Sequence, residues 1–375
     1  MARLEDIFVI TSGGTPNRKN NEYYDNGTVP WVKTGDLKEK YVPQEVECIT
    51  ELGVKNSSAK RFPEGTVLVA MYGATIGACS ILPYEATTNQ ACAAFLPNEH
   101  VLPDFLYYFL CGKKEKFIKD GVGGAQPNIS ASYLKSVEIF VPSLEEQQRT
   151  ILILDAVDTL LSLRKRQLAK LDELVKSRFV EMFIGKNYSR KTVDEVSLGK
   201  GEYGAQSASV EYTPDRPRYV RITDINDDGT LNNDVVSSIN HSDDDQYRLR
   251  YGDFLFARMG ATVGKTYAFR EGNQIYAGYL IRYKLDLTQI HPLYLFWYTR
   301  LNEYWDWVKL NQSGAAQPGI NAKKFGSLRI PVPPIDIQNR FVAFVAEVDK
   351  SKFAVQQSID QLETLKKSLM QQYFG

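Results

Sequence analysis

Residues 121–132 are GVGGAQPNISAS, and residues 313–322 are SGAAQPGINA. The Gln of the shared Ala-Gln-Pro letters is Gln126 in the first stretch and Gln317 in the second, 191 positions later. Downstream, SVEIFVPSLEEQQRTILILDAVD (136–158) matches SLRIPVPPIDIQNRFVAFVAEVD (327–349) at the same offset. A turn that recurs together with its flanking sequence indicates a duplicated unit rather than a chance repeat.

The similarity extends upstream of both turns in the same order. MYGATIG (71–77) matches RMGATVG (258–264), GTVLVA (65–70) matches GDFLFA (252–257), and WVKTGDL (31–37) matches YVRITDI (219–225). The offset drifts only from 187 to 191 residues along the whole chain. We therefore predict two copies of one unit.

Each copy has a β-rich part followed by a helical part. The β-rich part contains short runs such as TVLVAMYG and YLIRYKL between turn signals, with one apolar helical segment, 104–119 in the first copy and 293–308 in the second. The last part has no Gly or Pro for about 40 residues, which predicts one long helix. Ser143 and Glu146 form a capping box at the start of the first helix, and Pro334 suits the first turn of the second.

The long helices carry apolar residues at a seven-residue step, which predicts a coiled coil. The rows are Leu154, Leu161, Leu168 and Val175 in the first helix, and Val348, Val355, Leu362 and Leu369 in the second. Packing of each helix on its own domain is the alternative, but four or five heptads exceed the surface of a small domain. We predict an α+β fold with two β-rich domains, 1–142 and 186–333. They are related by a pseudo-twofold axis and separated by an antiparallel coiled coil of helices 143–185 and 334–375.

The sequence contains no pattern of an enzyme. It has no G-x-S-x-G, P-loop or His-Glu-x-x-His motif, and VPPID (332–336) lacks the aromatic residue of a nucleotide methyltransferase. The four cysteines have no CxxC spacing, and the acidic run SDDDQY (242–247) favours a solvated loop over a cation site. No signal peptide or membrane span is visible, so we expect a cytoplasmic protein. Because the motifs above are missing, we also expect no metal or cofactor in this chain.

With these motifs the chain resembles the specificity subunits of type I restriction-modification systems. The resemblance covers essentially the whole chain and rests on the order of ITSGGTP, PWVKTGDL, TTNQ (87–90), GGAQPNI, GAAQPGI and the helix starts PSLEEQQ and PPIDIQ. It implies a non-catalytic subunit with two target-recognition domains for the halves of a bipartite, asymmetric DNA target, and helices that set the gap. It implies two modification subunits and motor-nuclease restriction subunits as partners; S-adenosylmethionine, ATP and magnesium belong to those partners. In the second copy TTNQ has no clear counterpart beyond NQIYAGY.

The duplication divides the candidate DNA contacts into two groups. Residues alike in both copies are expected to support the turn or contact the DNA backbone, and these are Gln126 and Gln317, with Thr75 and Thr262 as hydroxyl donors to phosphate. Polar residues that differ are better candidates for base contacts. They are Arg18, Lys19, Lys33, Thr34, Tyr72, Asn89 and Gln90 in the first copy, and Arg218, Arg221, Thr223, Arg258, Met259, Lys265 and Tyr276 in the second.

The charge balance limits how the chain could hold DNA. Residues 1–142 carry 14 basic and 16 acidic side chains, residues 187–333 carry 18 and 17, and the whole chain is neutral. A DNA-binding face must therefore be a local patch, and we expect weak binding by the isolated chain. A protein–protein scaffold built on a coiled coil is the alternative function, and a fused enzyme fragment is disfavoured by the missing catalytic motifs.

Overall fold

The computed structural model describes residues 1–121, 128–239, 245–314 and 318–375. It divides into two compact units, Met1–Arg166 with Gln356–Gly375, and Gln167–Val355. Each unit contains one copy of the repeat and takes part of both long helices. Each long helix is therefore divided between the two units.

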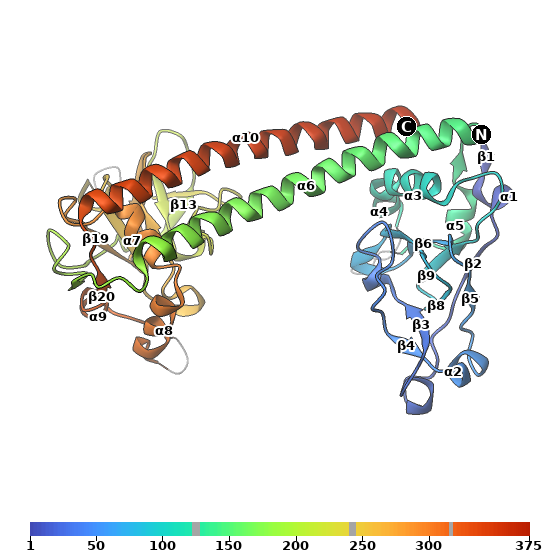
Figure 1. Cartoon of the computed structure of the whole chain (residues 1–375), viewed down its shortest axis with the longest axis horizontal. Coiled ribbons are helices and arrows are strands. Elements are labelled where there is room, and N and C mark those ends of the chain that lie inside the picture. The colour runs from blue at the N-terminus through green and yellow to red at the C-terminus, as the bar shows by residue number, and fades with distance from the viewer. Residues whose placement is uncertain (122–127, 240–244, 315–317) are drawn as a thin grey trace. The chain divides into compact units, whose positions relative to one another are not determined.

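The first unit contains two four-stranded sheets, drawn in blue and cyan in Figure 1. The first has the order β2 (Ile10–Ser12), β9 (Cys92–Phe95), β6 (Val67–Ala70) and β7 (Cys79–Ile81). The second has the order β4 (Cys48–Ile49), β3 (Val29–Val32), β8 (Ala86–Thr88) and β5 (Arg61–Phe62). Strand β6 is buried on both faces: Val67 and Val69 pack in one apolar cluster, and Leu68 and Ala70 pack in another. This alternation is the two-residue period of a strand, here with both sides covered.

The second unit also contains two four-stranded sheets. Its sheets have the orders β12 (Glu202–Tyr203), β19 (Leu280–Lys284), β16 (Asp253–Ala257), β17 (Thr266–Ala268), and β13 (Ser209–Glu211), β15 (Ser237–Ile239), β14 (Arg218–Val220), β18 (Gln274–Tyr276). Phe254 and Phe256 of β16 point into one cluster and Leu255 and Ala257 into another, as in β6. The predicted duplication is confirmed for the first sheet, for the burial of its central strand, and for three strands of the second sheet, β4-β3-β8 and β15-β14-β18. The fourth strand differs, because β5 pairs with β8 in the first unit and β13 pairs with β15 in the second.

Short helices and two-stranded pairs complete the units. In the first unit these are α1 (Leu4–Ile7), α2 (Glu51–Lys55), α3 (Pro103–Gly112), α4 (Lys114–Asp120), α5 (Ala131–Ser136) and the pair β1 (Ala2–Arg3) with β10 (Glu138–Ile139). In the second they are α7 (Pro292–Tyr298), α8 (Asn302–Asn311), α9 (Ala322–Gly326) and the pair β11 (Arg190–Thr192) with β20 (Arg329–Pro331). Each predicted apolar helical segment is therefore two helices, α3 with α4 and α7 with α8. Among the described residues, no helix is both long enough and apolar enough to span a bilayer.

The two long helices are α6 (Leu144–Phe183) and α10 (Ile335–Phe374), each of 40 residues, or roughly 60 Å. In the first unit the Asp158 carboxylate pairs with Lys366 (2.5 Å), and Lys165 pairs with Glu363 (3.1 Å). In the second, Asp172 pairs with Lys352 (2.7 Å). In the first unit these pairs run in opposite chain directions, and in the second unit Phe179 and Phe183 pack against Phe341, so the pairing within each unit is antiparallel (Figure 1).

The predicted seam lies inward along both helices. Leu154, Leu161 and Val175 of α6 and Val348 and Val355 of α10 are buried. Leu168, Leu362 and Leu369 are half-buried. Leu154, Val175 and Val348 pack in the domain cores, as in the alternative of a helix packed on its own domain. The heptad row is thus buried or half-buried throughout, with the ion pairs between the helices beside it.

The start of each long helix is tied to its domain by a buried glutamine. Gln147 accepts a hydrogen bond from Leu102 N (2.9 Å) and donates to the carbonyls of His100 (2.9 Å) and Pro142 (3.0 Å). Gln338, 191 positions later, makes the same three kinds of bond, to His291 N, Gln289 O and Pro333 O. The capping box of Ser143 and Glu146 is present as predicted. Each helix therefore leaves its domain at a position held by a fully hydrogen-bonded side chain.

Candidate nucleic-acid interface

Most of the predicted contact residues of the first copy follow the ends of three strands. Strands β3 and β8 run parallel, so their carboxyl ends meet at one edge. The turn after β8 bonds back to both neighbours, through Asn89 N to Val32 O (3.0 Å) and Met71 N to Ala91 O (2.9 Å). The chain thereby gathers residues 33–36, 71–75 and 89–91 into one surface.

The second copy builds the same surface with the same backbone bonds. Ala277 N donates to Val220 O (2.9 Å), and Arg258 N donates to Tyr279 O (3.1 Å). This register aligns TTNQ (87–90) with IYAG (275–278), which lies within the NQIYAGY stretch that the sequence offered as a loose counterpart. The residues gathered are 221–224, 258–262 and 277–279.

A fourth segment joins each surface, and a glycine allows its close approach. Gly14 N donates to Thr88 O, and Ala205 N donates to Tyr276 O, both at 2.9 Å. A Cβ atom on Gly13 or Gly204 would clash with the backbone of the neighbouring strand. We call the four gathered segments of each copy its strand-end surface: 13–16, 33–36, 71–75 and 89–91 in the first, and 204–207, 221–224, 258–262 and 277–279 in the second.

Different side chains support equivalent points of the two surfaces. In the first copy the Trp31 indole donates to Gly14 O (3.0 Å); in the second the Tyr219 hydroxyl donates to Ala205 O (2.7 Å). An aspartate closes the turn that follows β3 and the turn that follows β14. Asp36 accepts a hydrogen bond from Lys33 N (2.8 Å), and Asp224 accepts one from Arg221 N (2.9 Å). The backbone scaffold is thus common to the copies while the side chains on it differ.

Two cations, Lys33 in the first strand-end surface and Arg18 beside it, are partly neutralised by one carboxylate. Arg18 lies over the rings of Tyr24 (4.5 Å) and Trp31 (4.6 Å) and pairs with Glu47. Lys33 also pairs with Glu47, at 2.7 Å. The hydrogen bond from Arg18 lowers the pKa of Glu47, against the opposing effect of burial and with help from Lys33. Lys19, next to Arg18, is exposed.

The uncharged candidates of the first copy are exposed to different degrees. Tyr72 is exposed, Thr34 is half-buried, and Asn89 uses its side-chain oxygen to accept from Ala91 N (3.2 Å). The Gln90 oxygen accepts from the Thr15 hydroxyl (2.5 Å), which orients the amide. The hydroxyl of Thr75 donates to Tyr72 O (3.2 Å), so in this structure its proton is used within the turn and not offered outward as predicted.

In the second copy most predicted cations have partners. Arg218 donates to Asn233 Oδ1 (2.7 Å), Arg221 pairs with Asp224 (2.8 Å), and Lys265 pairs with Asp227 (2.8 Å). Arg258 differs, because its side chain has no hydrogen-bond or ion-pair partner within the described part of the chain, and its guanidinium lies 4.8 Å from the centre of the Tyr203 ring. The buried Nε of Arg218 is also unpartnered, but the terminal nitrogens of Arg218 are hydrogen-bonded.

The remaining predictions for the second copy have mixed outcomes. Thr223 is exposed, and Met259 is half-buried and bridges to the backbone of Gly319. The Thr262 hydroxyl donates to Met259 O (3.2 Å), as Thr75 does in its own turn. Tyr276 is fully buried and packs edge-on against Tyr247. Its place is the core, because the residue at the end of β18 faces inward, so the expectation that it contacts a base is not supported.

A hollow of about 610 Å³ opens in the second strand-end surface. Its lining includes Gln206, Ser207, Arg221, Thr223, Arg258 and Tyr279, and no acidic residue lines it. The hollow therefore presents guanidinium, hydroxyl and amide groups. Such a set suits an anionic or polar ligand.

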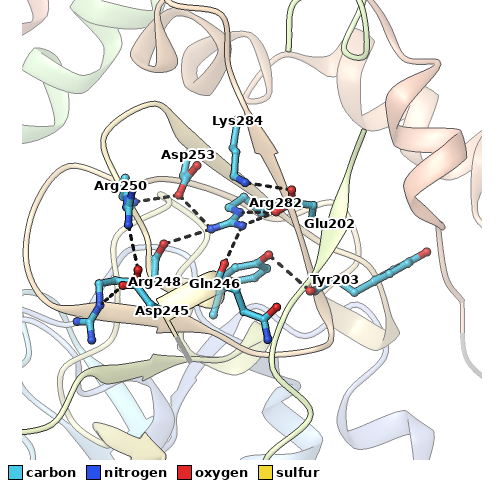
Figure 2. A network of polar contacts seen from close by, with 10 residues as sticks. Glu202, Tyr203, Asp245, Gln246, Arg248, Arg250, Asp253, Arg282 and Lys284 are labelled. Carbon is cyan, nitrogen blue, oxygen red and sulfur yellow. Dashed lines mark hydrogen bonds and ion pairs between the residues drawn. The ribbon is translucent and has the colours of Figure 1, made fainter. Parts of the chain in front are cut away.

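An ionic network lies beside this surface in the second copy, centred on Arg282 (Figure 2). Arg282 is 4% exposed; it pairs with Glu202 and Asp253 and donates to the carbonyls of Gln246 and Arg248. Its guanidinium also lies 4.9 Å from the centre of the Tyr276 ring. Burial raises the pKa of Asp253, while the hydrogen bonds from Arg282 and Lys284 outweigh burial and lower the pKa of Glu202.

This network was not predicted from the sequence. Its signal was a charged residue inside each of two apolar strands, Asp253 in GDFLFA and Arg282 in YLIRYKL. Charged residues are rarely buried unless they are paired. By the sheet registers, the first copy has Thr66 and Ala94 at the equivalent positions, so the network belongs to the second copy.

Some predicted residues lie outside the described part of the chain. Gln126 and Gln317 do, as do residues 242–244 of the acidic run. Among the residues described, no group of three or more His, Cys, Asp or Glu side chains could hold a metal ion. His291 caps α7, where its ring accepts from Leu293 N (3.1 Å).

The chain matches the family of type I restriction modification DNA specificity domains over residues 1–173 and 206–364. It is 35% identical over 187 residues to the type I restriction enzyme MjaIX specificity subunit of Methanocaldococcus jannaschii, covering 48% of this chain and 43% of that protein. It is 30% identical over 162 residues to the EcoR124I/EcoR124II specificity subunit of Escherichia coli, covering 42% and 40%. In both cases the match spans less than half of the relative.

Two solved structures share the fold. One chain, from a study of complex assembly and conformational transition in a type I restriction-modification system, has a TM-score of 0.66 and 19% identity over 100% of this chain and 96% of its own. The S subunit of a type I restriction-modification system from M. genitalium has a TM-score of 0.57 and 13% identity, over 100% and 95%.

Proposed function

Since the chain belongs to the family of type I restriction modification DNA specificity domains, we propose that it selects the DNA target of a type I restriction-modification enzyme. Each domain recognises one half of a bipartite, asymmetric target through its strand-end surface. The paired helices α6 and α10 fix the spacer between the halves. The chain itself carries out no chemistry.

One observation supports this proposal most strongly: the two strand-end surfaces have the same pattern of main-chain hydrogen bonds but display different side chains. The turns are held by the same main-chain bonds in both copies, including Asn89 N to Val32 O and Ala277 N to Val220 O. The residues displayed differ, for example Asn89 against Ala277 and Lys33 against Arg221. A common scaffold with different displayed groups is what recognition of two different half-sites requires.

The chemistry belongs to partner subunits in this proposal. Two modification subunits dock on the helices and methylate DNA with S-adenosylmethionine, and motor-nuclease subunits add ATP- and magnesium-dependent cleavage. The assembly acts in the cytoplasm. Since neither domain is basic overall, tight DNA binding requires those partners, and the isolated chain binds weakly.

Selection from a pool of random DNA duplexes tests the proposal. The chain, purified together with its modification subunits, is expected to enrich duplexes that share two short sequence blocks separated by a fixed gap. No enrichment of any sequence would instead favour a protein–protein scaffold. Nanomolar, salt-resistant DNA binding by the isolated chain would contradict the dependence on partners.

A further inference from the structure

We infer that the hollow beside Arg258 binds a phosphate group of the DNA backbone. The inference rests on the proposed function and adds a specific site to it. It also makes the two recognition domains unequal, since only the second has a cation without a carboxylate partner at this position.

Arg258 is the cation that the second surface leaves without a carboxylate. Arg221 is held by Asp224, and Lys265 by Asp227, both at 2.8 Å. Within the described residues, the Arg258 side chain makes no hydrogen bond or ion pair, and its Nε is buried. Its Nε has lost water without gaining an acceptor, while the half-buried side chain lines the hollow, so the guanidinium is available to bind an anion there.

The hollow itself favours an anion. Its walls hold two arginines together with Ser207, Thr223 and the Gln206 amide, and no acidic side chain lines it. This is the local positive patch that the neutral domain needs if it is to hold DNA.

The recessed position of Arg258 favours a phosphate over a base. Its backbone is fixed on both sides, by Arg258 N to Tyr279 O (3.1 Å) and Ile320 N to Arg258 O (2.9 Å), and its guanidinium lies over the Tyr203 ring. A base edge lies at the floor of a major groove about 8.5 Å deep and must be reached by a projecting side chain. Phosphates stand on the outside of the duplex and can enter a hollow.

The first copy has no equivalent cation. The sheet register aligns Met71 with Arg258, and Met71 is 3% exposed. Lys33 aligns with Arg221 and pairs with Glu47. The first domain therefore lacks the charge that would hold a phosphate at this point.

The salt dependence of DNA binding by the full chain tests this inference. Affinity for several duplexes of different sequence is measured over a series of KCl concentrations. Arg258→Gln is expected to lower the slope of log affinity against log salt by about 0.9 and to weaken every duplex by a similar factor. Arg258→Lys keeps the charge and should keep the slope. Arg270→Gln, an exposed arginine before β18, is the matched control and should change neither quantity.

Each other outcome overturns the inference. Thermal unfolding first establishes that Arg258→Gln is folded. An unchanged slope, or a loss confined to duplexes that differ at one base pair, would assign Arg258 to another role. Inorganic phosphate that stabilises the wild type but not Arg258→Gln, with an unchanged DNA slope, would reduce the hollow to a free-anion site. If the wild type binds no duplex at low salt even together with its modification subunits, the proposed function fails as well, so the two failures are distinguishable.

Discussion

Most of the positively charged side chains at or beside the two strand-end surfaces form ion pairs within the chain itself. Glu47 holds both Arg18 and Lys33, and Asp224 holds Arg221. The sequence identifies these cations as candidates, but it does not reveal their carboxylate partners, because the separation along the chain differs from pair to pair. Glu47 lies 29 positions from Arg18, while Asp224 lies three positions from Arg221. Which cation stays unpaired is decided by tertiary packing.

Substitution Glu47→Gln tests the lowered pKa of that carboxyl group. The folded pKa lies below the ordinary value of 4.5, so the ion pairs stabilise the protein above that value and are lost as the pH falls through the folded pKa. At neutral pH the variant is expected to lose roughly 0.2–1 kcal/mol of unfolding free energy. Below the ordinary glutamate range this difference should disappear.

Thermal unfolding of both proteins over a pH series provides the measurement. Glu45→Gln removes a neighbouring exposed carboxylate and is the control. A difference between wild type and Glu47→Gln that is the same at acidic and neutral pH would mean that ionisation of Glu47 contributes nothing.

At the scale of elements, the long helices could be predicted from the sequence, whereas the breaks within shorter helices and the strand pairing could not. The heptad rows and the capping box predicted α6 and α10 to within two residues of their ends, because a long uninterrupted helix has a strong local signal. The apolar segments 104–119 and 293–308 each broke into two helices, since periodicity does not reveal where a helix turns. Tyr276 was misplaced because the letters offered NQIYAGY only as a loose counterpart of TTNQ, and the strand pairing is needed to fix the register.

The glutamines at the starts of α6 and α10 permit a test at this scale. Gln147→Ala leaves the N–H of Leu102 and two carbonyls without their partner, so we expect a loss of about 1–3 kcal/mol in unfolding free energy. Gln338→Ala should cost a similar amount. Gln148→Ala, at the exposed neighbouring position, is the matched control and should be nearly neutral. Chemical denaturation measures all three, and equal effects at positions 147 and 148 would contradict the account.

At the scale of the whole molecule, the duplication was the most informative feature of the sequence. It predicted two units of equal architecture and a pair of helices, and both are observed. Whole-chain charge was not informative, because local pairing and the hollow decide where positive charge remains.

The role of the two helices as a spacer can be tested by changing their length, within residues 160–175 of α6 and by a matching change in α10. Duplicating 161–167 in α6 together with 359–365 in α10 keeps the heptad seam and adds about 10.5 Å, close to the length of three base pairs. The selected DNA target should gain about three base pairs of spacer while both half-sites stay the same. An altered half-site with an unchanged spacer would contradict the role of the helices.

Mapping of DNA methylation in cells that carry this chain with its modification partner tests the central claim most directly. The account predicts methylation at one bipartite, asymmetric motif with a fixed gap, lost when the chain is deleted. Substitutions in the first strand-end surface, such as Gln90→Ala, should alter one half of the motif and leave the other unchanged. A methylation pattern that is the same with and without the chain would contradict the account.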